Sequence, residues 1–235
     1  MVGWIIPPPK PPIKSKSKLL IEKQKKIVWL KNQGFLKSKR IEDAMLKVPR
    51  ELFVPYFYRD HTYEELPFPL PGKNSTISCP HSYPMFYEAI NLTKGDNFLE
   101  VGTGSGYGAV LAREIVGSLG SVTTIEIDSA TIQYARQIIN TFNYHNLYVI
   151  KGDGGNGYEV HAPYDKICIT VACPKIPPPL IAQLKEGGAL ITPCLTTRPN
   201  QDLIVLEKHK DGTIIKRVVE KVLYVPLQGD YATEI

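Results

Sequence analysis

Ten residues near the middle of the chain, Glu100–Ala109, combine the end of a buried strand with a glycine-rich turn and the start of a helix. They read EVGTGSGYGA and directly follow two apolar residues. Gly102 and Gly104 permit backbone conformations with positive φ, and Gly106 lets the following helix pack closely. The free N–H groups at the start of a helix can hold a polar ligand. The segment therefore predicts a strand–turn–helix unit that grips a nucleoside cofactor.

The sequence around this turn alternates between short apolar runs and amphipathic stretches. Expected strands cover residues 98–101, 122–126, 147–151, 166–171 and 188–193, and the helices between them cover 107–115, 129–142 and 179–185. This alternation predicts an α/β fold with a doubly wound, mostly parallel sheet. Two further runs, 203–209 and 214–225, flank Asp211-Gly212 and predict a C-terminal β-hairpin. Helices at 19–32 and 39–47 are expected before the sheet, with Val28 on the buried side of the first.

Composition divides the chain into four segments. The 235 residues suffice for one sizeable domain with additions. Residues 1–17 are rich in proline and lysine and predict an extended arm. Residues 18–75 are expected to form N-terminal helices and a substrate-side loop, 76–195 the cofactor-binding catalytic core, and 196–235 a β extension of the same domain.

Two acidic residues follow the glycine turn at strand ends. Glu126 lies where a doubly wound fold places a ribose-binding carboxylate, and Asp153 ends the next strand, within reach of an adenine amine. The glycine spacing is G-x-G-x-G, and Tyr107 stands where a dinucleotide fingerprint has its third glycine. The pattern therefore favours S-adenosylmethionine over NAD or FAD.

Composition also limits the compartment and the metal chemistry. No apolar run approaches the ~20 residues of a membrane span, and no signal or transit peptide is recognisable, so the cytoplasm is expected. The four cysteines show no C-x-x-C spacing and no paired histidines, so we predict free, mostly buried thiols and no metal. Residues 1–50 carry 13 Lys or Arg against 3 acids, which makes the basic charge local. We interpret these lysines as solubilising rather than as a nucleic-acid or membrane surface.

Several segments together resemble the protein-L-isoaspartate O-methyltransferase family. They read TISCP, EVGTGSGYGA, GDGGNGYEVHAPYDKI and AQLKEGGALITP, with RELFVP upstream and YVPLQG downstream. The resemblance runs from about Lys26 to Gly229. EVGTGSGY alone is shared by many methyltransferases, whereas the TISCP and GDG…APYD segments and the closing VPL, in this order, are much more specific.

The resemblance implies a Rossmann-like methyltransferase fold and methyl transfer to the free α-carboxylate of isoaspartyl residues in damaged proteins. The family's active-site serine matches Ser78, beside the hydroxyl of Thr76, and His81 is a candidate substrate contact. Tyr83 stands where some members have a histidine, so no role is carried over there. The implied S-adenosylmethionine contacts are Glu100, Gly102, Thr103, Gly104, Ser105, Gly106, Glu126, Asp153 and Gly154.

The reaction class agrees with these residue types, because a carboxylate nucleophile with a pKa near ~4 needs no general base at neutral pH. Two alternatives use the same cofactor fold: a nucleic-acid methyltransferase and a non-catalytic S-adenosylmethionine-binding protein. The segment Thr170–Pro174 lacks the Asn or Asp-Pro-Pro-aromatic motif of base-amine methylation, and Cys173 is a weak candidate for cytosine chemistry. We expect isoaspartyl proteins and peptides as partners, no nucleic acid or membrane, and possible homo-oligomers through the arm.

Overall fold

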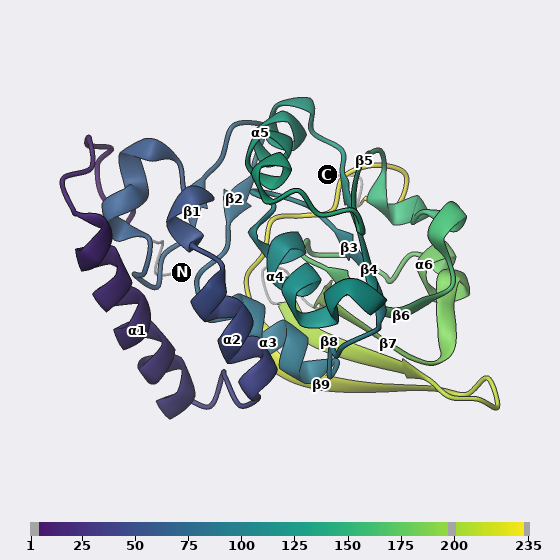
Figure 1. Ribbon diagram of the computed structural model, residues 1–235. Helices are drawn as coiled ribbons and strands as arrows, with labels where there is room; N and C mark the ends of the chain where they lie inside the picture. Colours follow the sequence, from purple (N-terminus) through teal and green to yellow (C-terminus); the bar gives the residue numbers. More distant parts are fainter. Residues whose placement is uncertain (1–4, 197–200, 233–235) are drawn as a thin grey trace.

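The computed structural model of the chain describes residues 5–196 and 201–232 and contains a seven-stranded sheet (Figure 1). The strand order is β5-β4-β3-β6-β7-β8-β9, in which the first five strands run parallel and β8 and β9 continue the sheet antiparallel. The strands are β3 (Asn97–Val101), β4 (Ser121–Glu126), β5 (Leu147–Lys151), β6 (Tyr164–Ile169), β7 (Leu184–Leu195), β8 (Gln201–Lys208) and β9 (Ile214–Val222). The predicted parallel sheet and closing hairpin are confirmed.

Helices cover both faces of the sheet, as Figure 1 shows. They are α1 (Lys16–Asn32), α2 (Lys39–Lys47), α3 (Ser82–Ala89), α4 (Tyr107–Val116), α5 (Ser129–Ile139) and α6 (Pro178–Gln183). In one core, the five helices α1, α2, α3, α4 and α5 pack against one face of the sheet, which includes Phe98 and Cys168. The other joins α6 with the opposite face, including Leu99 and Ile167. Neighbouring residues of one strand thus enter different cores, which explains why the strand sequences are apolar on both sides.

The main errors of the sequence reading lie at element ends and on one helix face. The predicted helix 129–142 ends its α-helical part at Ile139, and strand β7 is longer than the predicted 188–193. Val28 is 57% exposed, so its predicted burial is wrong. The buried stripe of α1 instead includes Lys23, whose ammonium group donates to the carbonyls of Leu46 and Val48 at the end of α2. A lysine that satisfies helix-terminal carbonyls is buried without leaving its charge unpaired.

A two-stranded unit precedes the sheet. Strands β1 (Phe68–Pro69) and β2 (Thr76–Ile77) pair antiparallel, with Phe68 opposite Ile77. This pairing brings the residues before β1 next to those after β2, and the loop after β2 leads into α3. The TISCP segment is therefore held by local pairing as it enters the region above the large sheet.

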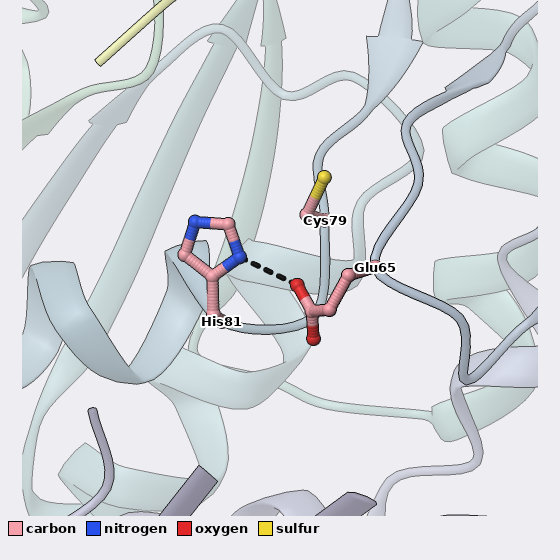
Figure 2. Close-up of side chains that lie close together, drawn as sticks. All are labelled: Glu65, Cys79 and His81. Carbon is pink, nitrogen blue, oxygen red and sulfur yellow. Dashed lines mark hydrogen bonds and ion pairs between the residues drawn. The ribbon is translucent and has the colours of Figure 1, made fainter. Parts of the chain in front are cut away.

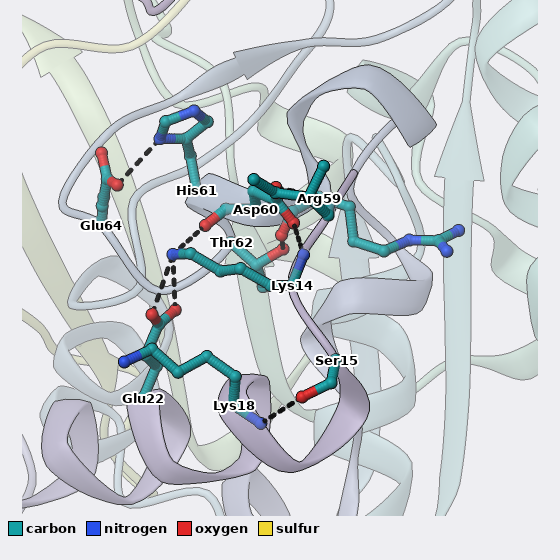
Figure 3. A network of polar contacts seen from close by, with 10 residues as sticks. Lys14, Ser15, Lys18, Glu22, Arg59, Asp60, His61, Thr62 and Glu64 are labelled. Carbon is teal, nitrogen blue, oxygen red and sulfur yellow. Dashed lines mark hydrogen bonds and ion pairs between the residues drawn. The ribbon is translucent and has the colours of Figure 1, made fainter. Parts of the chain in front are cut away.

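The proline-rich arm lies against its own chain in the part that the structure describes (Figure 3). The backbone N–H groups of Ile13 and Lys14 donate to the carboxylate of Asp60, at 2.9 and 3.0 Å. The ammonium group of Lys14 forms an ion pair with Glu22 of α1 at 2.8 Å. The Ser15 hydroxyl accepts a hydrogen bond from the Lys18 amide and caps α1. The helix thus begins three residues before the predicted start at Leu19.

Candidate active site

The glycine turn and the TISCP segment border the same cavity, at the carboxyl ends of the parallel strands. The cavity has a volume of about 760 Å³. Its lining includes the turn after β3, the end of β4, the two residues after β6 (Thr170 and Val171), and residues from the segments 74–83 and 220–228. Doubly wound folds bind their ligands at this edge of the sheet, and the volume is suitable for a nucleoside-sized molecule.

Close packing explains two of the glycines in the turn. Gly102 has φ +95°, and a Cβ there would lie 2.4 Å from the Thr170 hydroxyl oxygen, which donates to the Gly102 carbonyl at 2.8 Å. Gly106 has φ +85°, and a Cβ there would lie 2.7 Å from Ile139 of α5. Gly102 borders the cavity, whereas Gly106 serves the packing of α4 against α5 and is not part of the cavity wall.

Glu126 presents a buried carboxylate to the cavity. One of its oxygens accepts a hydrogen bond from the Gly104 amide and the other from the Asp128 amide, both at 3.0 Å. Burial raises the pKa of Glu126, while these backbone hydrogen bonds act in the opposite direction. A carboxylate has about four acceptor sites. Glu126 therefore retains acceptor capacity for ligand hydroxyl groups.

Asp153 is held differently from Glu126. Its carboxylate accepts hydrogen bonds from the amides of Gly155 and Asp230, at 2.8 and 2.7 Å. A Cβ on Gly229 would lie 2.2 Å from the same carboxylate. Of the predicted pair, Gly154 lines the cavity and Asp153 does not. The structure thus places Asp153 beside the cavity wall, where it ties the loop after β5 to the C-terminal segment.

Glu100 is a second buried acid in the cavity wall. Its carboxyl group accepts a hydrogen bond from the Thr124 hydroxyl at 2.7 Å, and Thr124 lies 2.7 Å from the Thr103 hydroxyl. Burial raises the pKa of Glu100 to about 8. At neutral pH most of the Glu100 side chains are therefore uncharged, so the cavity floor carries less negative charge than its residue types suggest.

The predicted hydroxyl residues Thr76 and Ser78 both line the cavity. Their segment is held by Arg50, which is only 1% exposed. The Arg50 guanidinium donates to the Ser78 carbonyl at 2.6 Å and to the Thr62 carbonyl at 3.0 Å. Sequence reasoning assigned Arg50 no function, although a cation inside the largely apolar motif RELFVP was a usable signal.

Aromatic rings surround this arginine. The guanidinium carbon lies 5.6 Å from the ring centroid of Tyr83 and 5.2 Å from that of Tyr107, within the range of cation–π contacts. Tyr83 lines the cavity, and its ring meets Tyr107 edge-on at 4.8 Å. Tyr107 itself is buried and packs on Phe53. The two tyrosines thus fix Arg50 in place.

His81 lines the cavity near Ser78 and is paired with a residue that sequence reasoning missed. Its Nδ1 lies 2.5 Å from a carboxylate oxygen of Glu65, as Figure 2 shows. The other oxygen of Glu65 pairs with Lys26 at 2.9 Å. Although burial opposes ionisation, the hydrogen bonds from His81 and Lys26 hold the pKa of Glu65 below its usual value. His81 is therefore oriented by an ionised carboxylate.

Within the described part of the chain, no helix has the length and apolar character needed to cross a membrane. The four cysteines are free and buried, as predicted. Burial raises the pKa of Cys173 to about 12. A buried thiol of this kind is a poor nucleophile, which disfavours the cytosine-methylation alternative.

Comparison with known proteins identifies the family. The sequence profile of the family described as Protein-L-isoaspartate(D-aspartate) O-methyltransferase matches residues 21–232. Protein-L-isoaspartate O-methyltransferase 2 of Archaeoglobus fulgidus is 42% identical over 210 residues, which cover 89% of this chain and 94% of the relative. Protein-L-isoaspartate O-methyltransferase of Ignicoccus hospitalis is 43% identical over 195 residues, which cover 83% of this chain and 92% of the relative.

Solved structures agree with this result. One described as protein-L-isoaspartate O-methyltransferase superimposes with a TM-score of 0.81 at 30% identity, over 89% of this chain and 67% of that one. A putative protein-L-isoaspartate O-methyltransferase from Plasmodium falciparum, in complex with S-adenosyl-L-homocysteine, has the same fold. It superimposes with a TM-score of 0.77 at 23% identity, over 87% of this chain and 97% of that one. The motifs, the fold and these relatives lead to one conclusion: the chain belongs to the protein-L-isoaspartate O-methyltransferase family.

Proposed function

We propose that this protein transfers the methyl group of S-adenosylmethionine to the free α-carboxylate of L-isoaspartyl residues in damaged proteins and peptides. The methyl ester then closes to a succinimide, and hydrolysis of the succinimide returns part of the material to normal aspartate. The observation that carries the proposal is the single cavity shared by the glycine turn and the TISCP segment. A cofactor held at the turn and a carboxylate held at Ser78 would therefore meet in one enclosed space.

The cofactor would be held at the side of the cavity that contains the glycine turn. The proposed contacts are Gly102, Thr103, Gly104 and Ser105 of the turn together with Glu100, Glu126 and Gly154, whereas Gly106 and Asp153, which do not line the cavity, would act by holding the turn and the loop after β5 in place. Glu126 is the strongest of these assignments, because it is a buried acceptor in the cavity wall with lone pairs to spare. When bound, S-adenosylmethionine supplies an electrophilic methyl group on a sulfonium centre.

At the other side of the cavity, the Ser78 hydroxyl would donate a hydrogen bond to one oxygen of the substrate carboxylate while the other oxygen attacks. Thr76 offers a second hydroxyl, and His81 is a candidate contact to the peptide. Arg50 acts indirectly as a positioning residue, because it fixes the Ser78 backbone. Charge disappears as a carboxylate meets a sulfonium, so exclusion of water and correct alignment favour the reaction.

The substitution Ser78→Ala tests this arrangement. We expect it to lower kcat/KM for an isoaspartyl peptide by ~10²-fold, comparable to the loss of one preorganised donor. Calorimetry should show unchanged affinity for S-adenosylmethionine. The exposed Ser118, replaced by alanine, is the matched control. Full activity of Ser78→Ala would remove the role given to that hydroxyl and leave the family assignment untouched.

We further infer that the protein works in the cytoplasm and that the arm supports contacts between copies. The arm exposes Ile5 and Ile13, which are apolar side chains available for such contacts. Sedimentation of the full chain and of a chain without the arm tests the second inference. Identical monomeric masses for both would refute it.

A further inference from the structure

Three different metal-binding side chains meet at the cavity wall near Ser78. One ligand atom from each of Glu65, Cys79 and His81 lies within 4.8 Å of the other two. Glu65 comes from the segment before β1, whereas Cys79 and His81 come from the loop between β2 and α3 (Figure 2). Pairing of β1 with β2 brings these segments together. A search for C-x-x-C spacing could not find this group, because Glu65 lies in a different segment from Cys79 and His81.

We propose that Glu65, Cys79 and His81 form a binding site for Zn²⁺, and that the bound ion inhibits methyl transfer by blocking the peptide side of the cavity. The inhibitory part rests on the proposed function, whereas the metal-binding part stands on the geometry alone. The ion is an inhibitor here and takes no part in the methyl-transfer reaction.

The donor set selects the metal. A thiolate, an imidazole and a carboxylate suit Zn²⁺, whereas Mg²⁺ and Ca²⁺ prefer oxygen ligands alone. Tetrahedral Zn²⁺ with ordinary bond lengths places its ligand atoms about 3.3–3.6 Å apart. The three ligand atoms lie within 4.8 Å, and the His81–Glu65 contact is 2.5 Å. No separation therefore has to shrink by more than about 1.5 Å, and the His81–Glu65 contact has to open by about 1 Å, which side-chain rotations can supply.

The charge of Lys26, which lies next to Glu65, does not prevent a cation from binding to the cluster. Lys26 pairs with one oxygen of Glu65, which leaves the oxygen that now faces His81 for the ion. Outer partners of this kind commonly orient a ligating carboxylate. Glu65 and His81 are already joined by a hydrogen bond, and Zn²⁺ would take the place of that hydrogen atom while a neutral imidazole carries its proton on Nε2. Because the Cys79 thiol loses its proton to solvent on binding, the net charge of the cluster would rise by one rather than by two.

Cys79 changes its ionisation state on binding. Burial, followed by the nearby charge of Glu65, raises the pKa of the Cys79 thiol to about 12, while the positive charges of Arg50 and Lys26 oppose that rise. Because a thiol binds Zn²⁺ as the thiolate, a bound ion displaces the Cys79 proton to solvent. Zinc binding should consequently release protons, and the affinity should increase as pH rises.

The position of the cluster determines how a bound ion would affect methyl transfer. Cys79 and His81 both line the cavity, and Cys79 directly follows Ser78 in the chain. An ion held by three protein ligands keeps a fourth position open for water. Such an ion would fill the space in which the isoaspartyl carboxylate is expected, and it would withdraw His81 from the peptide. Inhibition should therefore compete with the peptide and not with S-adenosylmethionine.

Direct metal binding is the first test. Metal-stripped full-length protein is titrated with Zn²⁺ against a chromophoric chelator, and with Co²⁺ to observe thiolate-to-cobalt charge-transfer absorption. We expect one equivalent to bind, and we expect Cys79→Ser and Glu65→Gln each to weaken binding by ~10-fold or more. Cys194→Ser is the matched control, because it removes a buried thiol outside the cluster. Thermal unfolding and calorimetry with S-adenosylmethionine verify that each variant is folded.

Enzyme kinetics provide the second test. Zn²⁺ should raise the KM for an isoaspartyl peptide, EDTA should reverse this effect, and Cys79→Ser should lose it relative to its own metal-free rate. Binding that Cys79→Ser and Glu65→Gln leave unchanged, or no binding at all, would overturn the proposed site. Binding without inhibition of an active enzyme would overturn the proposed blockage. If the protein methylated no isoaspartyl peptide, the titrations would still decide the metal site, so the two failures are distinguishable.

Discussion

The substitution Glu100→Gln is expected to make the protein more stable at alkaline pH. Glu100 is buried in the cavity wall, and burial raises its pKa from 4.5 to about 8, with a smaller contribution in the same direction from the charge of Glu126. Glutamine has nearly the same shape and can accept the same hydrogen bond from Thr124. It carries no charge at any pH, so the substitution removes the ionisation and little else.

The sign and size of the effect follow from proton linkage. The unfolded chain releases the Glu100 proton near pH 4.5, whereas the folded protein holds it to about pH 8. Between these values the folded state binds more protons, so its stability falls as pH rises and levels off above about pH 8. Each pH unit of this window is worth about 1.36 kcal/mol, which gives an upper limit of about 5 kcal/mol. Because glutamine does not ionise, the Glu100→Gln protein does not lose this part of its free energy of unfolding.

Urea unfolding of both proteins at pH 4.5, 6, 7 and 8.5 measures the effect. The stability of Glu100→Gln minus that of the natural sequence should be smallest at pH 4.5, increase steadily to pH 8, and then stay constant. A difference that is the same at pH 4.5 and 8.5 would show that Glu100 titrates near its ordinary pKa in the folded protein, and the description of this carboxyl group as neutral would be wrong.

Three further substitutions and one truncation test other parts of the structure. Glu126→Ala should weaken S-adenosylmethionine binding by ~1–3 kcal/mol, because ligand hydroxyls lose a buried acceptor, and unchanged calorimetric affinity would withdraw the cofactor assignment. Asp153→Ala should also weaken cofactor binding and, because Asp153 holds the Asp230 amide, should expose the C-terminal segment to proteolysis. Gly102→Ala should lower the thermal midpoint, because its Cβ would lie 2.4 Å from Thr170 at a φ of +95°. Deletion of residues 1–13, which leaves the Ser15 cap, should preserve kcat/KM and lower the thermal midpoint through loss of the hydrogen bonds from Ile13 to Asp60 and from Lys10 to Phe57, and a large loss of turnover would place the arm in the active site.

Local patterns predicted the framework of this protein well. Positive φ at Gly102, close packing at Gly106 and the alternation of strands and helices are determined by short stretches of sequence, and the structure has all of them. Val28 was misplaced because a helix turns about 100° per residue, so an apolar residue next to the buried Ile27 can face solvent. Periodicity alone does not reveal that Lys23 fills part of the buried stripe.

Contacts between distant segments were not accessible in the same way. Arg50 donates to the Ser78 carbonyl 28 residues away, and Glu65 meets His81 across 16 residues. Both pairs depend on how the segment between α2 and α3 folds over the cavity, which no periodic pattern records. For Asp153, the sequence predicted the position of the residue but not its partner. Its place at a strand end was predicted, but the C-terminal segment that engages its carboxylate became visible only in the structure.

The most direct test of the central claim is methyl transfer from S-adenosylmethionine to two peptides that differ only in having an isoaspartyl or a normal aspartyl residue. We expect a base-labile methyl ester on the isoaspartyl peptide and a rate at least ~10²-fold lower on its twin, because moving the carboxylate by one methylene takes the attacking oxygen out of line. Equal rates on both peptides, or a stable methylated base on RNA supplied in parallel, would contradict it.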